Sequence, residues 1–144
     1  MRASQRILAA AIAFAGLCGM AGCGPDGPKT YTVRGRVEVA GGEAKHLAGA
    51  NVEAALDSDP TQRASGVIEP DGTFALETLH EGKILKGAQA GSYKARIVLS
   101  DDGDRESKRQ QRTAVHPKFF KFETSGLTFQ VPTNGEVVLQ VSPR

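Results

Sequence analysis

Residues 31–39 read Tyr-Thr-Val-Arg-Gly-Arg-Val-Glu-Val, and every odd position in this stretch is apolar or glycine. The positions between them carry threonine, arginine or glutamate. A period of two places the apolar side chains on one face of a β-strand, whereas an α-helix would scatter them around its axis. The stretch therefore predicts a half-buried β-strand, and the same alternation can be followed outward along the chain.

The alternation returns in later segments, which are separated by turn-forming residues. Val52, Ala54 and Leu56 mark a second strand. Further strands are predicted at 93–99, 127–131 and 137–141 by the same period of two. In all of these segments the apolar positions predict the side chains that build the core.

Two turn motifs predict hairpins between neighbouring strands. Proline presets its backbone angle, aspartate accepts a hydrogen bond within a turn and glycine permits a positive φ, so Pro70-Asp71-Gly72 predicts a hairpin within 65–78. This hairpin is expected to face Phe74 and Leu76 inward. Asn134-Gly135 is a second hairpin signal and is predicted to join the last two strands.

The strands add up to seven, with turn signals between them, and no stretch beyond the first residues has sustained helical periodicity. This pattern predicts an all-β fold, a seven-stranded β-sandwich over residues 30–144. The very polar segment 101–113 is predicted to be a loop that contains at most a turn or two of helix.

The first residues differ from the rest of the chain. Arg2 and Arg6 form a short basic start, and residues 7–22 then carry no charge. A basic start, an apolar run and small residues together predict a secretory signal peptide at 1–22. The run is too short and too rich in alanine and glycine for a stable membrane-spanning helix. Residues 23–29 are expected to be a tether, since 24–28 consist of turn formers and aspartate.

The signal segment ends in Met20-Ala21-Gly22-Cys23. This sequence resembles the bacterial lipobox, in which small residues precede an invariant cysteine whose thiol takes up diacylglycerol. The resemblance implies an exported protein attached to a bacterial membrane, on its periplasmic or surface face, through acyl chains on Cys23. An ordinary signal peptide and a core cysteine are the alternative interpretations. Cys18 does not fit the lipobox, because Leu17 precedes it.

Cleavage at this site would change two properties of the chain. Cys18 would be removed and Cys23 acylated, which would leave the folded part without a cysteine for disulfides. The loss of Arg2 and Arg6 would leave 16 cationic against 16 anionic residues, because the full chain has 18 Lys and Arg against 16 Asp and Glu. Zero formal charge gives no reason to expect a nucleic-acid partner.

Four short motifs follow one another along the chain: Val33-Arg34-Gly35-Arg36-Val37, Leu47-Ala48-Gly49-Ala50-Asn51-Val52, Pro70-Asp71-Gly72-Thr73-Phe74 and Ala90-Gly91-Ser92-Tyr93-Lys94-Ala95. Their order and spacing resemble the carboxypeptidase regulatory-like, or transthyretin-like (prealbumin-like), domain family. That family carries V-x-G-x-V, L-x-G-A-x-V, D-G-x-F and P-G-x-Y-x-V at these places, and Ala90 stands for its proline. The closing segments 115–119 and 125–129 resemble a subgroup of small bacterial lipoproteins.

The resemblance implies an Ig-like (prealbumin-like) Greek-key sandwich and no particular activity. A hydroxyisourate hydrolase of this fold would be expected to end in Tyr-Arg-Gly-Ser, but this chain ends in Val-Ser-Pro-Arg. Serine-hydrolase elbows and glycine-rich phosphate loops are also missing from the sequence. The expected function is therefore that of a non-enzymatic binding or spacer module without a cofactor.

Three groups of residues are candidates for a metal or lipid-binding site. His46, His80 and His116 have no metal-ligand spacing and are expected to be surface or loop residues. A dense acidic cluster suits Ca²⁺ by ligand type, but cations follow it at once, so a solvated loop is favoured. The cluster comprises Asp101, Asp102, Asp104 and Glu106. The cations that follow are candidates for contact with anionic lipid head groups, although a role in solubility is favoured. They are Arg105, Lys108, Arg109 and Arg112.

The aromatic residues fall into two sets. Four are predicted to face the core: Tyr31, Phe74, Tyr93 and Phe129. Phe119, Phe120 and Phe122 are too closely spaced for all of them to face inward on a strand. An exposed patch formed by one or two of these three is the basis of one alternative function, an accessory subunit that docks onto an envelope complex. A carbohydrate-binding module is the other alternative.

Overall fold

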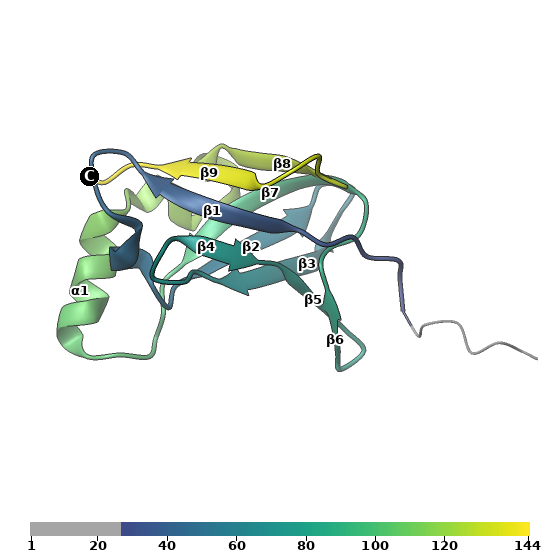
Figure 1. The fold of residues 1–144 in the computed structure, drawn as a ribbon, viewed down its shortest axis with the longest axis horizontal. Coiled ribbons are helices and arrows are strands. Elements are labelled where there is room, and N and C mark those ends of the chain that lie inside the picture. The colour runs from purple at the N-terminus through teal and green to yellow at the C-terminus, as the bar shows by residue number, and fades with distance from the viewer. Residues whose placement is uncertain (1–26) are drawn as a thin grey trace, which may run out of the picture.

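The computed structural model describes residues 27–144 of the chain, which are mostly β and form two sheets (Figure 1). The signal peptide expected at 1–22 and the expected lipidation site Cys23 lie outside the described residues. Among residues 27–144 no helix is long and apolar enough to cross a membrane.

The larger sheet has six strands in the order β6-β5-β3-β2-β7-β8, and all neighbouring pairs are antiparallel. In chain order its strands are β2 (Asn51–Leu56), β3 (Asp59–Val67), β5 (Glu77–His80), β6 (Lys83–Lys86), β7 (Gly91–Val98) and β8 (Leu127–Val131). The interior strands β2 and β7 are among those predicted from alternation. The burial of β7 from Tyr93 onward follows the predicted period of two, and that of β2 follows it up to Ala54, after which Ala55 is buried as well.

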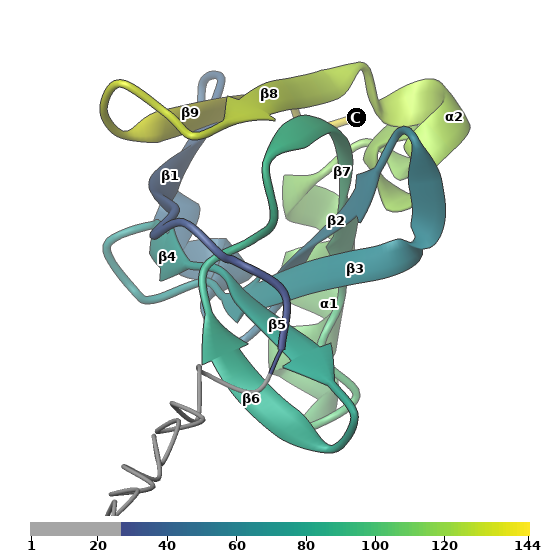
Figure 2. The ribbon, with the colours of Figure 1, turned by 90° about the vertical axis from the view of Figure 1, so that its right-hand side faces the viewer.

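The smaller sheet has the order β4-β1-β9, with β1 (Arg34–Val39) in the middle. β4 (Thr73–Ala75) is antiparallel to β1, whereas β9 (Val137–Val141) is parallel to it, with Val37 opposite Leu139. Figure 2 shows β1 and β4 of the small sheet on one side of the molecule and β2 and β7 of the large sheet on the other, with β8 and β9 together at the top. Residues 27–144 confirm the predicted β-sandwich, and this part of the chain has nine strands in place of the seven predicted.

The core lies between the two sheets and consists of the apolar faces that the alternation predicted. Val37 and Leu139 of the small sheet and Ile97 of the large sheet are almost completely buried. The predicted inward residues Phe74 and Leu76 are buried as well. Tyr93 is buried and stacks on Phe129, and Tyr31 is partly buried against the core, so all four aromatic residues expected inside contact it. Such burial contributes about 25 cal/mol per Å² of apolar surface.

Neither predicted hairpin is a hairpin between paired strands. The turn at Pro70-Asp71-Gly72 forms, with a hydrogen bond of 2.8 Å from the Gly72 amide to the Glu69 carbonyl, but it links β3 to β4 in the other sheet. The segment around Asn134-Gly135 likewise links β8 of the large sheet to β9 of the small one. Both turns are corners between layers, because β4 and β9 find their partner in β1.

Six further elements of residues 27–144 were not predicted as separate elements. β5 and β6 form a hairpin over the two-residue turn Glu81-Gly82, where both residues have positive φ, 48° and 78°. The segment predicted to be a loop contains the ten-residue helix α1 (Arg105–Ala114), so that prediction is wrong. Shorter helical segments are η1 (Ala44–Leu47), η2 (Pro117–Phe120) and α2 (Phe122–Ser125).

Candidate functional site

The acidic and basic residues of 101–112 are brought together on and just before helix α1, which caps one end of the sandwich (Figure 1). The helix begins after Asp104, whose carboxylate accepts a hydrogen bond of 2.7 Å from the Ser107 amide. This is an N-cap, which satisfies one of the unpaired amides of a helix start. Glu106 in the first turn and Arg112 in the last turn both complement the helix dipole.

A single buried polar side chain holds α1 against the sandwich. Gln111 accepts a hydrogen bond from the Ser100 amide and donates one to the Ala48 carbonyl, both of 3.0 Å. Ser100 follows β7 and Ala48 follows η1, so Gln111 joins the helix to two separate parts of the chain. The helix has no apolar stripe, and Gln111 is its only fully buried residue. This explains why periodicity gave no signal for it.

The exposed side of α1 is a basic face, which comprises Arg105, Lys108, Arg109 and Arg112. Their spacing of three and four residues places them along one side of a helix. Together with Gly103 and Thr113 they line an open hollow of about 470 Å³, and no acidic side chain is part of that lining. Within residues 27–144, none of the four cations forms an ion pair. The basic face therefore keeps its charge available for an anion from outside.

The neighbouring acidic residues do not build a cation site. The hydrogen bond from the Ser107 amide lowers the pKa of the Asp104 carboxyl, and that carboxylate is already used as a helix cap. Among residues 27–144 no group of three or more His, Cys, Asp and Glu side chains is arranged to hold a metal ion.

The three histidines belong to different segments of the fold. His46 belongs to η1, with its Nε2 atom 3.9 Å from Glu43, and His80 ends β5. The Nδ1 atom of His116 accepts a hydrogen bond of 3.1 Å from the Lys118 amide and caps η2. None of the three belongs to a metal-binding group of three or more side chains within residues 27–144.

The aromatic residues at 119–122 do not form an exposed patch, so that expectation is corrected. Phe119 is buried in the core, and Phe120 is partly buried against it. Phe122 is half-buried, and its ring centroid lies 4.8 Å from the Arg96 Cζ atom and 5.5 Å from the Arg63 Cζ atom. The residues lie on the helical turns η2 and α2, where Phe119 is buried and Phe120 and Phe122 are partly buried.

Phe122 completes a charged cluster that the sequence did not reveal. Glu53 in the middle of the large sheet accepts hydrogen bonds of 2.7 Å from both Arg63 and Arg96, one on each oxygen. Burial alone would raise the pKa of Glu53, yet the hydrogen bonds and charges of Arg96 and Arg63 lower it. The partners come from β2, β3, β7 and α2, so no local spacing could have found them. A hollow of about 260 Å³ lies beside Arg63 and Phe122.

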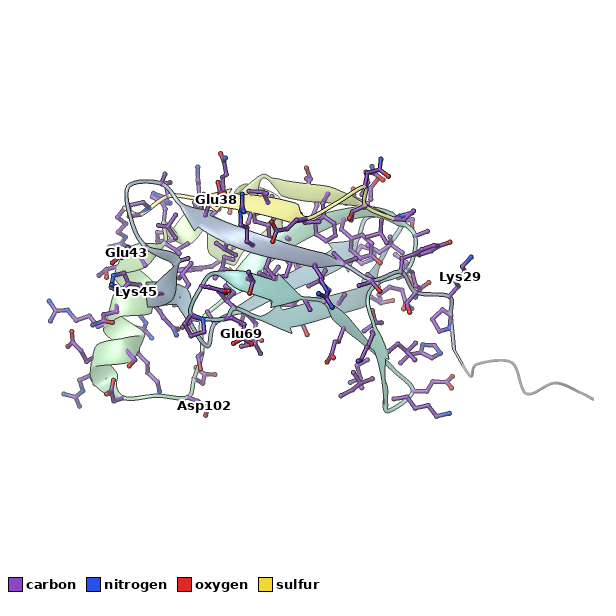
Figure 3. All side chains as sticks on the ribbon, viewed as in Figure 1. Lys29, Glu38, Glu43, Lys45, Glu69 and Asp102 are labelled. Carbon is purple, nitrogen blue, oxygen red and sulfur yellow. The ribbon has the colours of Figure 1, made fainter. Side chains whose placement is uncertain are left out.

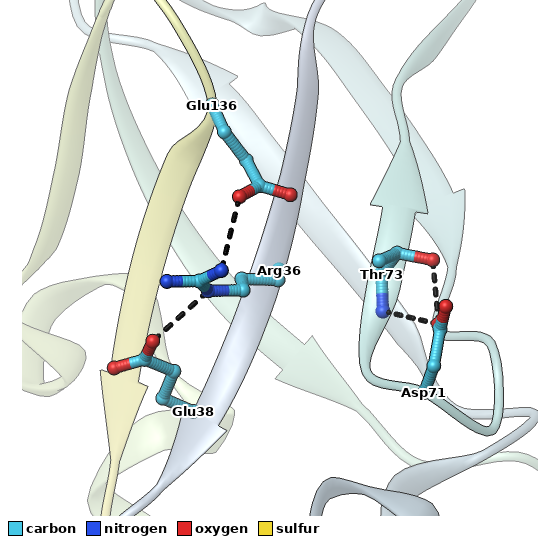
Figure 4. A network of polar contacts seen from close by, with 5 residues as sticks. All are labelled: Arg36, Glu38, Asp71, Thr73 and Glu136. Atoms are coloured by element: carbon cyan, nitrogen blue, oxygen red, sulfur yellow. Dashed lines mark hydrogen bonds and ion pairs between the residues drawn. The ribbon is translucent and has the colours of Figure 1, made fainter.

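The outer face of the small sheet carries simpler ion pairs (Figure 4). Arg36 on β1 contacts Glu38 at 2.9 Å and Glu136 at 3.4 Å, and all three side chains are exposed. Nearby, the hydroxyl and amide of Thr73 donate hydrogen bonds to the Asp71 carboxylate, which lowers the pKa of Asp71 and stabilises the turn. These ion pairs and hydrogen bonds give the charged side chains of Arg36, Glu38, Glu136 and Asp71 a structural role.

The most exposed large apolar side chains lie on the β5–β6 hairpin. Leu79 is 71% exposed and Ile84 is 68% exposed, and the two residues are direct partners across the hairpin. Figure 3 places Glu43, Lys45 and Asp102 at the α1 end of the molecule and Lys29 at the other end, beside this hairpin. The basic face and the apolar pair thus lie at opposite ends of the sandwich.

Comparisons of the chain with protein-family models, with curated proteins and with solved structures found no match.

Proposed function

We propose that this protein is a lipid-anchored envelope protein whose non-catalytic β-sandwich presents the basic face of α1 to an anionic partner. The observation that carries the proposal is the set of four cations that line one hollow without an acidic neighbour. A concave site that is lined only by cations raises the local concentration of anions. The arrangement therefore favours a binding module over a mere spacer.

The proposed anchor is Cys23 within the lipobox-like sequence 20–23. A single acyl chain gives only reversible attachment, whereas two or three chains on one cysteine hold a domain stably. The described chain starts beside β6, at the end of the sandwich that lies away from α1 (Figures 1 and 2). In the anchored protein the basic face would therefore point away from the membrane that holds it. This orientation disfavours lipid head groups of that membrane as the ligand.

We infer that the sandwich is Ig-like and of the carboxypeptidase regulatory-like type. The proposal is supported by glycines of the resembling motifs: a Cβ on Gly35 would approach Phe74 and Val137 to 2.5 Å, and Gly49 and Gly72 have positive φ in turns. The carboxylates whose pKa is lowered support a non-catalytic role. Those of Asp71 and Asp104 stabilise a turn and a helix start, and that of Glu53 is paired with two arginines.

Phosphate is the anion that suits the basic face best. The face contains three guanidinium groups, and a guanidinium donates two parallel hydrogen bonds to phosphate or carboxylate. The four cations extend along the helix, so a polymer would contact more of them than a single ion. The proposed ligand is therefore a phosphate-bearing polymer of the envelope, and a carboxylate-rich protein is the competing possibility that the test separates.

The anchor is tested by detergent-phase partitioning of the full-length protein made in a bacterial host. We expect the wild type in the detergent phase and Cys23→Ala in the aqueous phase, because only the wild type carries acyl chains. Equal partitioning of the two proteins into the aqueous phase would reject the anchor.

The basic face is tested by titration of the anchored protein, held in detergent, with inorganic polyphosphate. Arg109→Gln should weaken binding roughly five-fold, which corresponds to about 1 kcal/mol for one near-surface cation. Arg34→Gln is the matched control, because Arg34 is an exposed arginine on the small sheet. Added salt should weaken binding steeply. Stronger binding of polyglutamate than of polyphosphate would assign the face to an acidic protein instead.

A further inference from the structure

The outer face of the β5–β6 hairpin displays two large apolar side chains that no other part of the described chain covers. Leu79 and Ile84 stand opposite each other in the strand register, so their side chains lie on the same face. Their partners one position along, Thr78 and Leu85, lie on the other face, and Thr78 is almost completely buried. Because side chains alternate between the two faces of a strand, Leu79 and Ile84 could face inward only if the register of the hairpin changed. Instead it presents them to the outside.

This hairpin lies where the described chain begins. A Cβ built on Gly27 would lie 3.1 Å from Leu85 Cδ1 and 3.5 Å from His80 Cδ2. Three residues later, the Thr30 hydroxyl donates a hydrogen bond of 2.9 Å to the Lys86 carbonyl, and Tyr31 then pairs with Ala88. The segment 27–31 therefore runs along β6 before it enters the sandwich, as Figure 2 shows.

The length of chain before this point limits how far the hairpin can lie from the anchor. Cys23 precedes Gly27 by four residues. Four residues span at most about 14 Å even when fully extended, at roughly 3.5 Å per residue. If Cys23 carries acyl chains, Gly27 must lie within about this distance of the membrane surface, and the hairpin that Gly27 contacts lies next to it.

The geometry points to the β5–β6 hairpin as a second membrane contact, in which Leu79 and Ile84 enter the interfacial region of the bilayer that holds the anchor. This inference rests on the proposed lipidation of Cys23. Exposed apolar side chains next to an anchored cysteine gain free energy when they leave water for that region. Two contacts, the acyl chains and the hairpin, would orient the sandwich and hold α1 away from the membrane.

The charges around the hairpin give no strong preference for an anionic membrane over a neutral one. Lys29, Lys83 and Lys86 are balanced in part by Glu77 and Glu81. The contact should therefore depend on apolar burial and only weakly on anionic lipid. Pairing of two copies through the edge strand β6 is less favoured, because the segment 27–31 already uses the Lys86 carbonyl on that edge.

A tryptophan reporter tests this contact directly, because the chain contains no tryptophan. Ile84→Trp would place the only indole at the proposed contact. Val67→Trp is the matched control: Val67 is also an exposed β-branched residue, 51% exposed, on β3 of the same sheet, but it lies next to the start of β2, away from the hairpin. Both full-length proteins are made in a lipidating host and reconstituted into phosphatidylcholine vesicles with brominated acyl chains. Flotation shows whether each protein is anchored.

We expect both proteins to float, the Ile84→Trp emission to shift to the blue and its quenching by brominated chains to exceed that of Val67→Trp several-fold. Floating proteins with equally weak quenching would overturn the hairpin contact and leave the anchor standing. Failure to float would reject the anchor, and the hairpin inference with it. A blue shift that appears without vesicles and grows with protein concentration would assign the hairpin to a second copy and reject the membrane contact. Addition of anionic phosphatidylserine should change the quenching little.

Discussion

At the scale of single residues, Glu53 shows how the outer face of the large sheet is held together. Its side chain is 16% exposed and contacts two guanidinium groups, each of which also lies against the ring of Phe122. A carboxylate so enclosed depends on both partners, because an unpaired charge in this position would lose its solvation. Glu53 therefore ties α2 to three strands of the sheet.

The first prediction concerns the pH dependence of this cluster. Hydrogen bonds from Arg96 and Arg63 lower the pKa of Glu53 in the folded protein below its ordinary value of 4.5. The unfolded state therefore binds a proton more readily, so the stabilisation is complete above pH 4.5 and is lost as the pH falls through the folded pKa. Glu53→Gln should lower the free energy of unfolding at neutral pH by about 1–3 kcal/mol, and this difference should shrink in acid. Urea unfolding of both proteins at several pH values measures it.

Glu38→Gln is the control for that prediction. Glu38 also pairs with an arginine, Arg36, but both side chains are well exposed (Figure 4). An exposed pair contributes at most about 1 kcal/mol. Equal losses for Glu38→Gln and Glu53→Gln would show that the enclosed cluster has no special role in stability.

The second prediction concerns Gln111, the residue that holds α1. Gln111→Ala removes the partners of the Ser100 amide and the Ala48 carbonyl, and each unsatisfied buried group costs about 1–3 kcal/mol. We expect a lower urea midpoint and faster hydrogen exchange of the α1 amides. Gln110→Ala, at the exposed neighbouring position, should leave both measurements unchanged. Similar effects of the two substitutions would mean that α1 is held by other contacts.

At the scale of elements, the strands differ from the helices in how far the sequence foretold them. Alternation identified β1, β2, β7, β8 and β9, because each of these strands has one face on the core. Helix α1 was not predicted, because a cap at Asp104 and hydrogen bonds of Gln111 stabilise it, and neither produces a periodic pattern in the sequence. The candidate site was accordingly predicted as a set of residues, but its arrangement as one helical face was not.

Turns show a second limit of local sequence. Asn134-Gly135 has the composition of a hairpin turn, yet Val137, Leu139 and Val141 bury their side chains by pairing β9 with β1. The composition of a turn predicts that the chain reverses direction there, whereas the choice of partner strand depends on the whole core. Among residues 27–144 hairpins form instead between β2 and β3 and between β5 and β6, and the second uses Glu81-Gly82, a less typical turn.

The third prediction follows from that turn. Both of its residues have positive φ, which glycine and asparagine adopt more readily than glutamate. Glu81→Asn should therefore stabilise the protein by up to about 1 kcal/mol, and Gly82→Ala should destabilise it by about 1 kcal/mol. Thermal unfolding measures both changes. A stabilising Gly82→Ala would contradict the assigned backbone conformation.

At the scale of the whole molecule, the two sheets share one core and should unfold together. The fourth prediction is that Leu139→Ala and Ile97→Ala, one on each sheet, each cost about 2–5 kcal/mol, because both side chains are almost completely buried. Fluorescence of the two tyrosines, Tyr31 and Tyr93, and circular dichroism should give the same urea midpoint in each variant. Separate midpoints would show that the sheets unfold independently.

The position of β1 has a mechanical consequence for a protein held at its N-terminal side. β1 is the first strand of the sandwich and the middle strand of its sheet, with hydrogen-bonded neighbours on both sides. A force on the tether first loads the contacts of Thr30 with Lys86 and of Tyr31 with Ala88. It then acts along β1 (Figure 1) and loads both ladders in shear, so that many hydrogen bonds must break at once. A strand at the sheet edge and pulled sideways would instead unzip bond by bond. In the arrangement proposed above, the domain would meet a pull between membrane and partner with its shear-resistant strand.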